Sequence, residues 1–174
     1  MCDFGSVVFL SLVWRVGKRE RKDKNVFKIV RTEALTDAIY LMDVEAPRVA
    51  KNCLPGQFVI VRGSEDGERI PLTICDYSRE AGTITIVFQV VGAATEMMKN
   101  LKAGDSFTDF VGPLGRPSEL VEEDLETLKN KKILFVAGGV GTAPVYPQVK
   151  WLHEHGVAAD VIIGGRSKEL IILE

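Results

Sequence analysis

The sequence predicts an antiparallel six-stranded β-barrel followed by the first part of an α/β domain. Three observations lead to this fold class. Strand-like stretches broken by turn residues recur at intervals of about 10 to 15 residues from Val26 to Val111. After residue 132 the apolar residues instead form continuous runs, as in parallel strands covered on both faces. Between the two patterns lies an acidic polar stretch, where we expect a domain boundary.

The barrel strands follow from alternation of apolar and polar residues. In the clearest stretch, Ile84, Ile86, Phe88 and Val90 alternate with mostly polar neighbours, so one face is expected to point inward. Turn residues at Pro55-Gly56, Glu65-Asp66-Gly67 and Ala81-Gly82 separate the strands. The six predicted strands are 27–33, 39–45, 57–62, 70–75, 83–90 and 106–111.

One short helix interrupts the barrel. Met97, Met98 and Leu101 have helical spacing, and Thr95 before them is the expected N-cap. The segment Val91-Gly92-Ala93-Ala94-Thr95 therefore offers free backbone N–H groups at a helix start, which suit a phosphate.

The α/β part begins with the apolar run 133–137, which ends in a glycine-rich turn. A helix follows with Val145, Val149 and Leu152 on one stripe, Gly156 at its end, and Pro144 and Pro147 near its start. A second apolar strand covers 159–163. This is one βαβ unit, so the domain is expected to be Rossmann-like but incomplete.

These patterns divide the chain into four parts. They are an extension over 1–25, the barrel over 26–117, a connector that has room for a turn of helix over 118–131, and the partial α/β domain over 132–174. The chain of 174 residues is long enough for one complete domain and part of a second.

The extension does not match the rest of the chain. An apolar run over 7–14 is far shorter than the roughly 20 residues of a membrane span, and 15–24 is densely basic. We interpret 1–25 as a disordered or spurious extension without a membrane span. A weak tether to a membrane surface is the alternative.

Composition excludes several classes of protein. The chain has 22 basic and 24 acidic residues, which leaves no excess positive charge for a nucleic acid. The cysteines Cys2, Cys53 and Cys75 are odd in number and widely spaced, so neither a disulfide framework nor a metal site is predicted. A reducing, cytoplasmic compartment fits best. His153 and His155 lie at i, i+2 and face different directions on a helix, and no catalytic acid or base is assigned.

Two segments carry the chemistry. The turn Gly138-Gly139-Val140-Gly141-Thr142 stands between a buried strand and a helix start, where an anion is favoured, although a merely tight turn is the alternative. In Arg69-Ile70-Pro71-Leu72-Thr73, a guanidinium and a hydroxyl flank a proline that marks a sheet edge or irregularity. Here the alternative is a solvated Arg69 and an ordinary strand residue at Thr73.

Taken together, five motifs resemble the ferredoxin-NADP reductase superfamily in order and spacing. The resemblance is strongest to the small FAD-binding subunits of NADH-dependent reduced ferredoxin:NADP oxidoreductases (sulfide dehydrogenases), with the electron-transfer subunits of dihydroorotate dehydrogenase as near relatives. It covers residues 26–174. The motifs are Pro55-Gly56-Gln57-Phe58, Arg69-Ile70-Pro71-Leu72-Thr73, Val91-Gly92-Ala93-Ala94-Thr95, Gly112-Pro113-Leu114-Gly115 and Gly138-Gly139-Val140-Gly141-Thr142-Ala143-Pro144.

The resemblance implies FAD on the barrel and NAD(P)H on the α/β domain. Arg69 precedes Ile70 here, whereas relatives with the shorter motif have Arg directly before Pro. The flavin residues so implied are Arg69, Pro71, Leu72, Thr73, Val87, Phe88, Gln89, Gly92, Ala94 and Thr95. The nucleotide residues so implied are Gly138, Gly139, Gly141 and Thr142, and Arg166 is a candidate for a 2′-phosphate.

The implied activity is electron transfer between NAD(P)H and ferredoxin or an iron-sulfur partner through FAD. Implied partners are ferredoxin and a larger catalytic iron-sulfur flavoprotein subunit in a heterodimer. Full-length members carry a [2Fe-2S] centre, but none of its cysteine ligands is found in this chain, which is expected to be truncated. Two alternatives stay open, a non-catalytic flavin-binding or docking module and a dihydroorotate dehydrogenase electron-transfer subunit. NADH and NADPH also both remain open.

Overall fold

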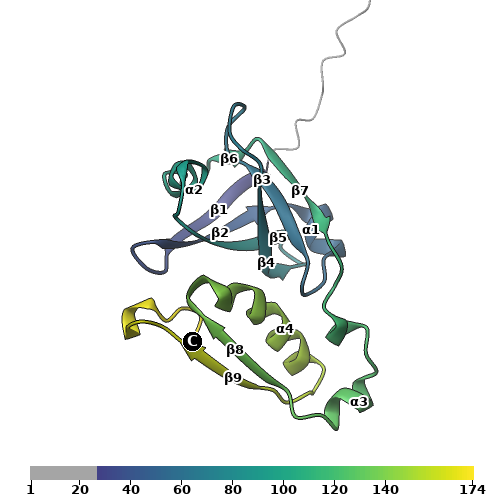
Figure 1. The fold of residues 1–174 in the computed structure, drawn as a ribbon. Coiled ribbons are helices and arrows are strands. Elements are labelled where there is room, and N and C mark those ends of the chain that lie inside the picture. Colours follow the sequence, from purple (N-terminus) through teal and green to yellow (C-terminus); the bar gives the residue numbers. More distant parts are fainter. Residues whose placement is uncertain (1–26) are drawn as a thin grey trace, which may run out of the picture.

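A computed structural model describes residues 27–174 (Figure 1). The predicted extension 1–25 and Cys2 lie outside these residues. The described part has two units joined by a connector. A β-barrel lies uppermost in Figure 1, and below it are one long helix and two strands.

The barrel is a single antiparallel sheet in which three of the six neighbouring pairs are strands consecutive in the sequence. The strand order is β6-β1-β2-β5-β4-β3-β7. The predicted turns at Pro55-Gly56, Glu65-Asp66-Gly67 and Ala81-Gly82 all connect its elements. The strands are β1 (Phe27–Ala34), β2 (Ile39–Glu45), β3 (Phe58–Arg62), β4 (Ile70–Ser78), β5 (Thr83–Gln89), β6 (Ser106–Phe107) and β7 (Asp109–Leu114).

The prediction of six strands was wrong, because the last predicted strand is two strands. Phe107 pairs with Phe27 on β1, whereas Asp109 pairs with Arg62 on β3. Between them, the backbone N–H and the hydroxyl of Thr108 both donate to the Arg62 carbonyl, 2.9 Å away in each case. The chain thus changes partner at Thr108, and β6 and β7 bring the two ends of the strand order together, so the sheet is nearly closed.

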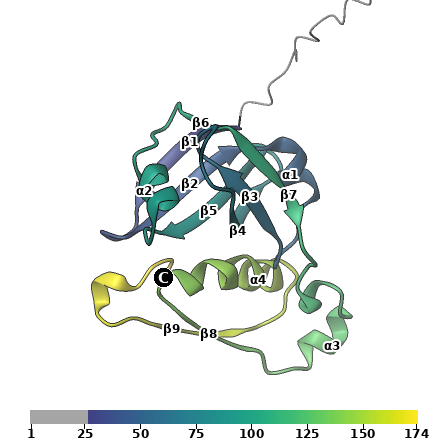
Figure 2. The same ribbon diagram turned by 45° about the horizontal axis from the view of Figure 1, so that its top comes forward.

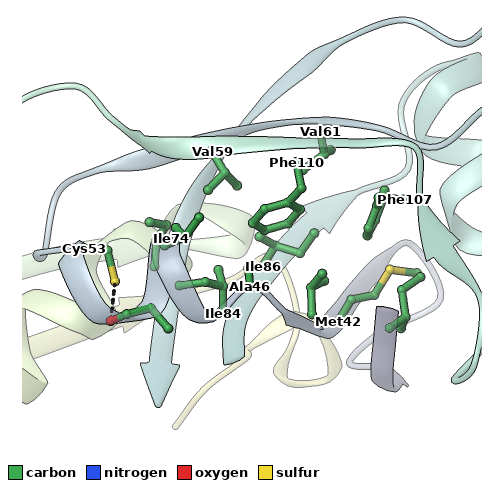
Figure 3. Packing of buried hydrophobic residues seen from close by; sticks show 14 of the residues in the cluster. Met42, Ala46, Cys53, Val59, Val61, Ile74, Ile84, Ile86, Phe107 and Phe110 are labelled. Carbon is green, nitrogen blue, oxygen red and sulfur yellow. Dashed lines mark hydrogen bonds between the residues drawn. The ribbon is translucent and has the colours of Figure 1, made fainter. Parts of the chain in front are cut away.

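The barrel interior is filled by the side chains that alternation predicted to point inward. Ile84, Ile86 and Phe88 of β5 are each at most 2 % exposed. Figure 3 shows Ile84 and Ile86 among Met42, Val59, Val61, Ile74, Phe107 and Phe110 in this core. Packing of this kind, at about 25 cal/mol per Å² of apolar surface buried, holds the strands in one register.

Two short helices interrupt the series of barrel strands, one after β2 and one after β5. The first, α1 (Pro47–Asn52), was not predicted; it begins at a proline and buries Val49 and Ala50. The helix α2 (Ala93–Lys99) was predicted, but Thr95 is not its N-cap. The N-cap is Gly92, and the Thr95 hydroxyl instead accepts from the N–H groups of Val91 and Gly92 at 3.0 and 3.1 Å. Thr95 therefore ties the helix start to the end of β5 from inside the first turn.

The connector leaves the barrel beside the turn at Gly56. Ser118 donates its N–H to the Pro55 carbonyl at 2.8 Å, and a Cβ at Gly56 would lie 2.6 Å from that nitrogen. Gly56 also has a φ of +93°, so two constraints favour glycine here. The connector holds a 3₁₀ turn (Glu119–Val121) and α3 (Leu125–Lys129). The domain boundaries stay predictions.

The second unit is a βαβ unit, as predicted. Parallel strands β8 (Leu134–Gly138) and β9 (Asp160–Gly164) pair in register, and α4 (Thr142–Glu154) joins them. Pro144 lies in the first turn of α4, but Pro147 lies inside the helix. Gly156, with a φ of +71°, ends the helix as predicted, and Val157 donates back to the Leu152 carbonyl at 2.9 Å while packing in the same cluster.

The two strands are covered on one face only, which corrects the expectation of strands buried on both. The helix α4 lies between them and β4 of the barrel (Figure 2). On the opposite face, Leu134, Val136 and Ile162 are 57 %, 69 % and 55 % exposed. Strand pairing places these three side chains together, since paired residues of parallel strands point to the same side. We call them the open apolar face.

The barrel and the second unit meet through a small apolar cluster, which we call the contact cluster. Its barrel members are Ile39, Leu41, Cys75 and Val87, and its other members are Ala143 of α4 and Ile172 near the C-terminal end. All six are at most 7 % exposed.

Among residues 27–174, no helix is long and apolar enough to cross a membrane.

Candidate functional site

A cleft of about 500 Å³ lies where the end of the barrel faces the start of α4, and we call it the barrel cleft. Strand β4 contributes Pro71, Leu72 and Thr73, and β5 contributes its last residues. The second unit contributes the glycine turn and the first residues of α4. The lining residues are Ile70, Pro71, Leu72, Thr73, Val87, Phe88, Gln89, Val91, Thr95, Val140, Gly141, Ala143 and Pro144.

Strand geometry decides how these residues face the cleft. Along β4, Leu72 and Ile74 pack with the barrel core, so Thr73 and Cys75 lie on the outer face. Along β5, Phe88 is 2 % exposed in the core, whereas Val87 belongs to the contact cluster. Thr73 thus presents a hydroxyl on the face turned toward the second unit, within a mostly apolar lining.

A second cleft, of about 480 Å³, lies at the carboxyl ends of β8 and β9, and we call it the glycine cleft. Four glycines form much of its wall, with one guanidinium, that of Arg166, beside them. Gly139 has a φ of +53°, and a Cβ built on it or on Gly141 would meet nothing within 4 Å. Open space therefore lies directly against the backbone at the turn. The lining residues are Ile39, Gln89, Gly138, Gly139, Val140, Gly164, Gly165, Arg166 and Leu170.

Eleven of the fifteen residues proposed from the sequence line these two clefts. In the barrel cleft they are Pro71, Leu72, Thr73, Val87, Phe88, Gln89, Thr95 and Gly141. In the glycine cleft they are Gln89, Gly138, Gly139 and Arg166. Their assignment to flavin and nucleotide stays a prediction, but the fold gathers residues from distant parts of the chain as that prediction requires.

Arg69, Gly92, Ala94 and Thr142 line neither cleft. Arg69 is 61 % exposed in its side chain, and its Nε donates to Asp109 at 3.1 Å, while Arg62 reaches the same carboxylate at 3.2 Å. Thr142 is 2 % exposed, and its hydroxyl lacks a hydrogen-bond partner among the described residues. A hydroxyl without a partner at the first turn of α4 fits a polar ligand at this helix start.

Several lining residues were missed by the sequence prediction. Gly164 and Gly165 follow β9 as Gly138 and Gly139 follow β8, and because the strands are parallel their ends share one edge of the sheet. That pattern could have signalled them. Ile39 gave no such signal, since it reaches the glycine cleft only because it pairs with Gln89 across β2 and β5.

The chemistry of both clefts fits the groups that the sequence predicted. Apolar side chains beside the Thr73 hydroxyl suit a planar heteroaromatic ring, and glycines beside the Arg166 guanidinium suit a diphosphate. A third cavity, of about 670 Å³, lies elsewhere and is lined by charged residues such as Arg31, Asp43, Asp76 and Lys150. None of the predicted site residues lines it.

No group of three or more histidine, cysteine or acidic side chains gathers as a metal site within residues 27–174. Cys53 and Cys75 are free and buried. Burial raises the pKa of the Cys53 thiol to about 11. Burial, with the carboxylates of Asp76 and Asp43 nearby, raises that of Cys75 to about 12. Both thiols are therefore protonated at neutral pH and take part in packing.

Comparison with known proteins identifies relatives of this chain. No protein-family model matches the chain. An uncharacterized protein of Clostridium beijerinckii is 60 % identical over 149 residues, which are 86 % of this chain and 50 % of that protein. A Thermotoga maritima homologue of the dihydroorotate dehydrogenase B (NAD(+)) electron transfer subunit is 40 % identical over 84 % of this chain and 49 % of its own length. The chain thus spans about half the length of these relatives.

Solved structures show the same fold. The NADH-dependent reduced ferredoxin-NADP oxidoreductase matches with a TM-score of 0.77 and 37 % identity, over 88 % of this chain and 53 % of the matched chain. Phthalate dioxygenase reductase matches with a TM-score of 0.68 at 19 % identity, over 84 % of this chain and 45 % of that one, and supports the fold alone. The chain is therefore a member of the ferredoxin-NADP reductase superfamily and a homologue of the dihydroorotate dehydrogenase B electron-transfer subunits.

Proposed function

We propose that this chain binds FAD in the barrel cleft and NAD(P)H with its diphosphate in the glycine cleft. It would then act as the electron-transfer part of a flavin oxidoreductase. The observation that carries the proposal is that the two clefts, each with a lining suited to its ligand, adjoin and share Gln89 and Val140. A nucleotide and a flavin bound there would be neighbours, as direct transfer between them requires.

The residues of the chain would bind and orient these groups. FAD, when bound, accepts two electrons with a hydride from the nicotinamide and passes electrons on singly. Thr73 would donate its hydroxyl to the flavin ring, and Leu72 and Val87 would pack beside it. Gly138 and Gly139 would let the nucleotide diphosphate approach the backbone, and Arg166 would pair with its charge. Arg69 would have to leave Asp109 to reach a flavin phosphate.

The electron acceptor we propose is an iron-sulfur protein, either ferredoxin or a larger iron-sulfur flavoprotein subunit in a heterodimer. The support is that relatives are named electron-transfer subunits, a name that implies a partner subunit. A [2Fe-2S] centre would lie outside this chain. The cytoplasm is the proposed location, because buried free thiols such as Cys53 and Cys75 are typical of reducing compartments.

For the nucleotide we propose NADH over NADPH. The reductase of 37 % identity is named as NADH-dependent, and two relatives of 40 % and 33 % identity are named with NAD(+). Arg166 is the one feature that favours NADPH, since a guanidinium suits a 2′-phosphate.

A second candidate function is a non-catalytic module that holds flavin or only docks on a larger subunit. The open apolar face of Leu134, Val136 and Ile162 favours docking, because monomeric proteins rarely leave such groups of aliphatic side chains uncovered. Under this function the chain would bind no nucleotide.

One titration separates these functions. The purified chain is incubated with FAD, freed of excess and titrated anaerobically with NADH and, separately, with NADPH while flavin absorbance is recorded. Retained flavin that is bleached by a nucleotide supports the electron-transfer function. Retained flavin that neither nucleotide bleaches supports the module, and failure to retain flavin rejects both flavin assignments.

A further inference from the structure

The barrel cleft and the glycine cleft have two wall residues in common, Gln89 and Val140. They come from different units, since Gln89 ends β5 and Val140 lies in the turn between β8 and α4. A ligand that extends from one cleft into the other therefore passes between these two side chains.

Each wall residue is held by its surroundings. The backbone of Gln89 pairs with Ile39 in the sheet, which fixes the strand end, and alternation puts its side chain on the same outer face as Val87. Val140 packs against the contact cluster. The junction thus has one polar and one apolar side, both on rigid supports.

The Gln89 amide is the polar group of this junction. Gln89 is exposed, and its side chain has no hydrogen-bond partner among the residues that the structure describes. A primary amide offers two N–H donors and a carbonyl acceptor. By contrast, Gln57 and Gln148, the other two glutamines of the chain, both use their amides within the protein.

We propose that Gln89 is the positioning residue that pairs with the carboxamide of the nicotinamide ring at this junction. This inference rests on the proposed function, because it assumes a dinucleotide whose diphosphate lies at the glycine turn. The nicotinamide arm of such a ligand would reach toward the barrel cleft past Gln89. Two primary amides can form a two-point pair, in which each donates one N–H to the carbonyl of the other. That pairing would fix the rotation of the nicotinamide ring.

The chemistry can be tested from both sides of the pair. In 3-acetylpyridine adenine dinucleotide the carboxamide is replaced by an acetyl group, which keeps the carbonyl and lacks the N–H donor. Gln89→Leu removes both hydrogen bonds at similar size. Gln89→Glu keeps an acceptor at the same length and removes the donor. Asn52→Leu, which loses an exposed amide on α1 outside both clefts, is the control.

Binding of the oxidised dinucleotides to the FAD-loaded chain is measured by calorimetry, so that no turnover is needed. The unmodified chain should bind NAD⁺ about three- to tenfold more tightly than the acetylpyridine analogue, as expected for one hydrogen bond. Gln89→Leu should weaken NAD⁺ by about tenfold and bind both dinucleotides alike. Gln89→Glu should retain a preference for NAD⁺, because its carboxylate still accepts from the carboxamide N–H. Asn52→Leu should match the unmodified chain.

Anaerobic reduction by NADH gives a second readout. Loss of ring orientation should lower the limiting rate of bleaching per bound flavin in Gln89→Leu. Equal preference for NAD⁺ over the analogue in Gln89→Leu and the unmodified chain would overturn the inference while leaving the proposed function intact. A chain that retains FAD and binds neither dinucleotide overturns the inference together with the nucleotide half of that function. Failure to retain FAD removes the function itself.

Discussion

Lys150 on α4 places its Nζ 2.7 Å from Oδ1 of Asp76 on β4, and so joins two units through residues 74 positions apart. The same carboxylate oxygen accepts the N–H of Tyr77 at 2.8 Å, which holds it in place. Beside the contact cluster, this ion pair is the principal polar link from α4 to the barrel among the described residues. The ion pair affects the candidate site, because it helps to fix α4 on the barrel and the glycine turn directly precedes α4.

Lys150→Met should therefore loosen α4 on β4. Both side chains are partly exposed, so the expected loss in the free energy of unfolding is about 0.5–1 kcal/mol. Chemical denaturation of Lys150→Met, Asp76→Asn and the double variant gives the coupling between them. Lys129→Met removes an exposed pair within α3 and is the matched control. A double variant whose loss equals the sum of the single losses would show that the pair adds nothing.

Thr73→Val should alter a bound flavin without altering the fold. The change removes a hydroxyl from the barrel cleft and keeps the shape of the side chain, so a hydrogen bond worth about 1 kcal/mol is lost. For a two-electron couple this corresponds to a shift of about 20 mV in the flavin potential. Thr83→Val, on β5 outside both clefts, is the control and should leave the potential unchanged. If the two variants have equal potentials, Thr73 does not contact the flavin.

Arg166→Leu should weaken nucleotide binding by about 10- to 100-fold, since a hydrogen bond to a charged group contributes about 1.5–3 kcal/mol. The residue lies in the wall of the glycine cleft and has no ion-pair partner among the described residues. Calorimetry measures the affinity of the variant and of the unmodified chain for NAD⁺ and NADP⁺, and the comparison shows which phosphate Arg166 contacts. Equal losses for both nucleotides indicate the diphosphate, and a loss confined to NADP⁺ indicates the 2′-phosphate. Unchanged affinity for both would remove Arg166 from the site.

Stability should fall between about pH 9 and 12. Burial raises the pKa of Cys53 from its ordinary value of 9.0 to about 11, and that of Cys75 to about 12. Partial burial of Lys150 acts to lower its pKa, but the hydrogen bond and charge of Asp76 outweigh this effect and raise it. Groups with a pKa raised in the folded state stabilise the fold fully below their unfolded pKa, and the stabilisation is lost as pH rises through the folded values.

The same thiols should be inert in the folded protein at pH 8. In a Cys2→Ser background, a thiol reagent should label Cys53 and Cys75 only after denaturant is added, because both are buried and protonated. Denaturation curves at pH 8, 9.5 and 11 measure the alkaline loss of stability. Rapid labelling without denaturant, or a flat pH dependence, would contradict the burial of these side chains.

The sequence was most informative where local pattern decides structure. Alternation along β5 identified the inward side chains Ile84, Ile86 and Phe88, because a strand turns successive residues to opposite faces. The run of glycines after β8 and the glycine at 156 marked a turn and a helix end, since these need backbone conformations that other residues disfavour. Motif order then indicated the superfamily, which the comparisons confirmed.

Tertiary structure alone decided the features that depend on partners far away in the chain. The stretch 106–111 reads as one strand, and only pairing with β1 on one side of Thr108 and β3 on the other divides it. Arg69 looks available for a phosphate until the fold brings Asp109 to it from 40 residues away. Gln89 likewise becomes a junction residue only because α4 docks on the barrel and carries Val140 to it. The sequence pattern predicts which face of a helix or strand a residue occupies. Which other residues lie against that face depends on how the elements pack.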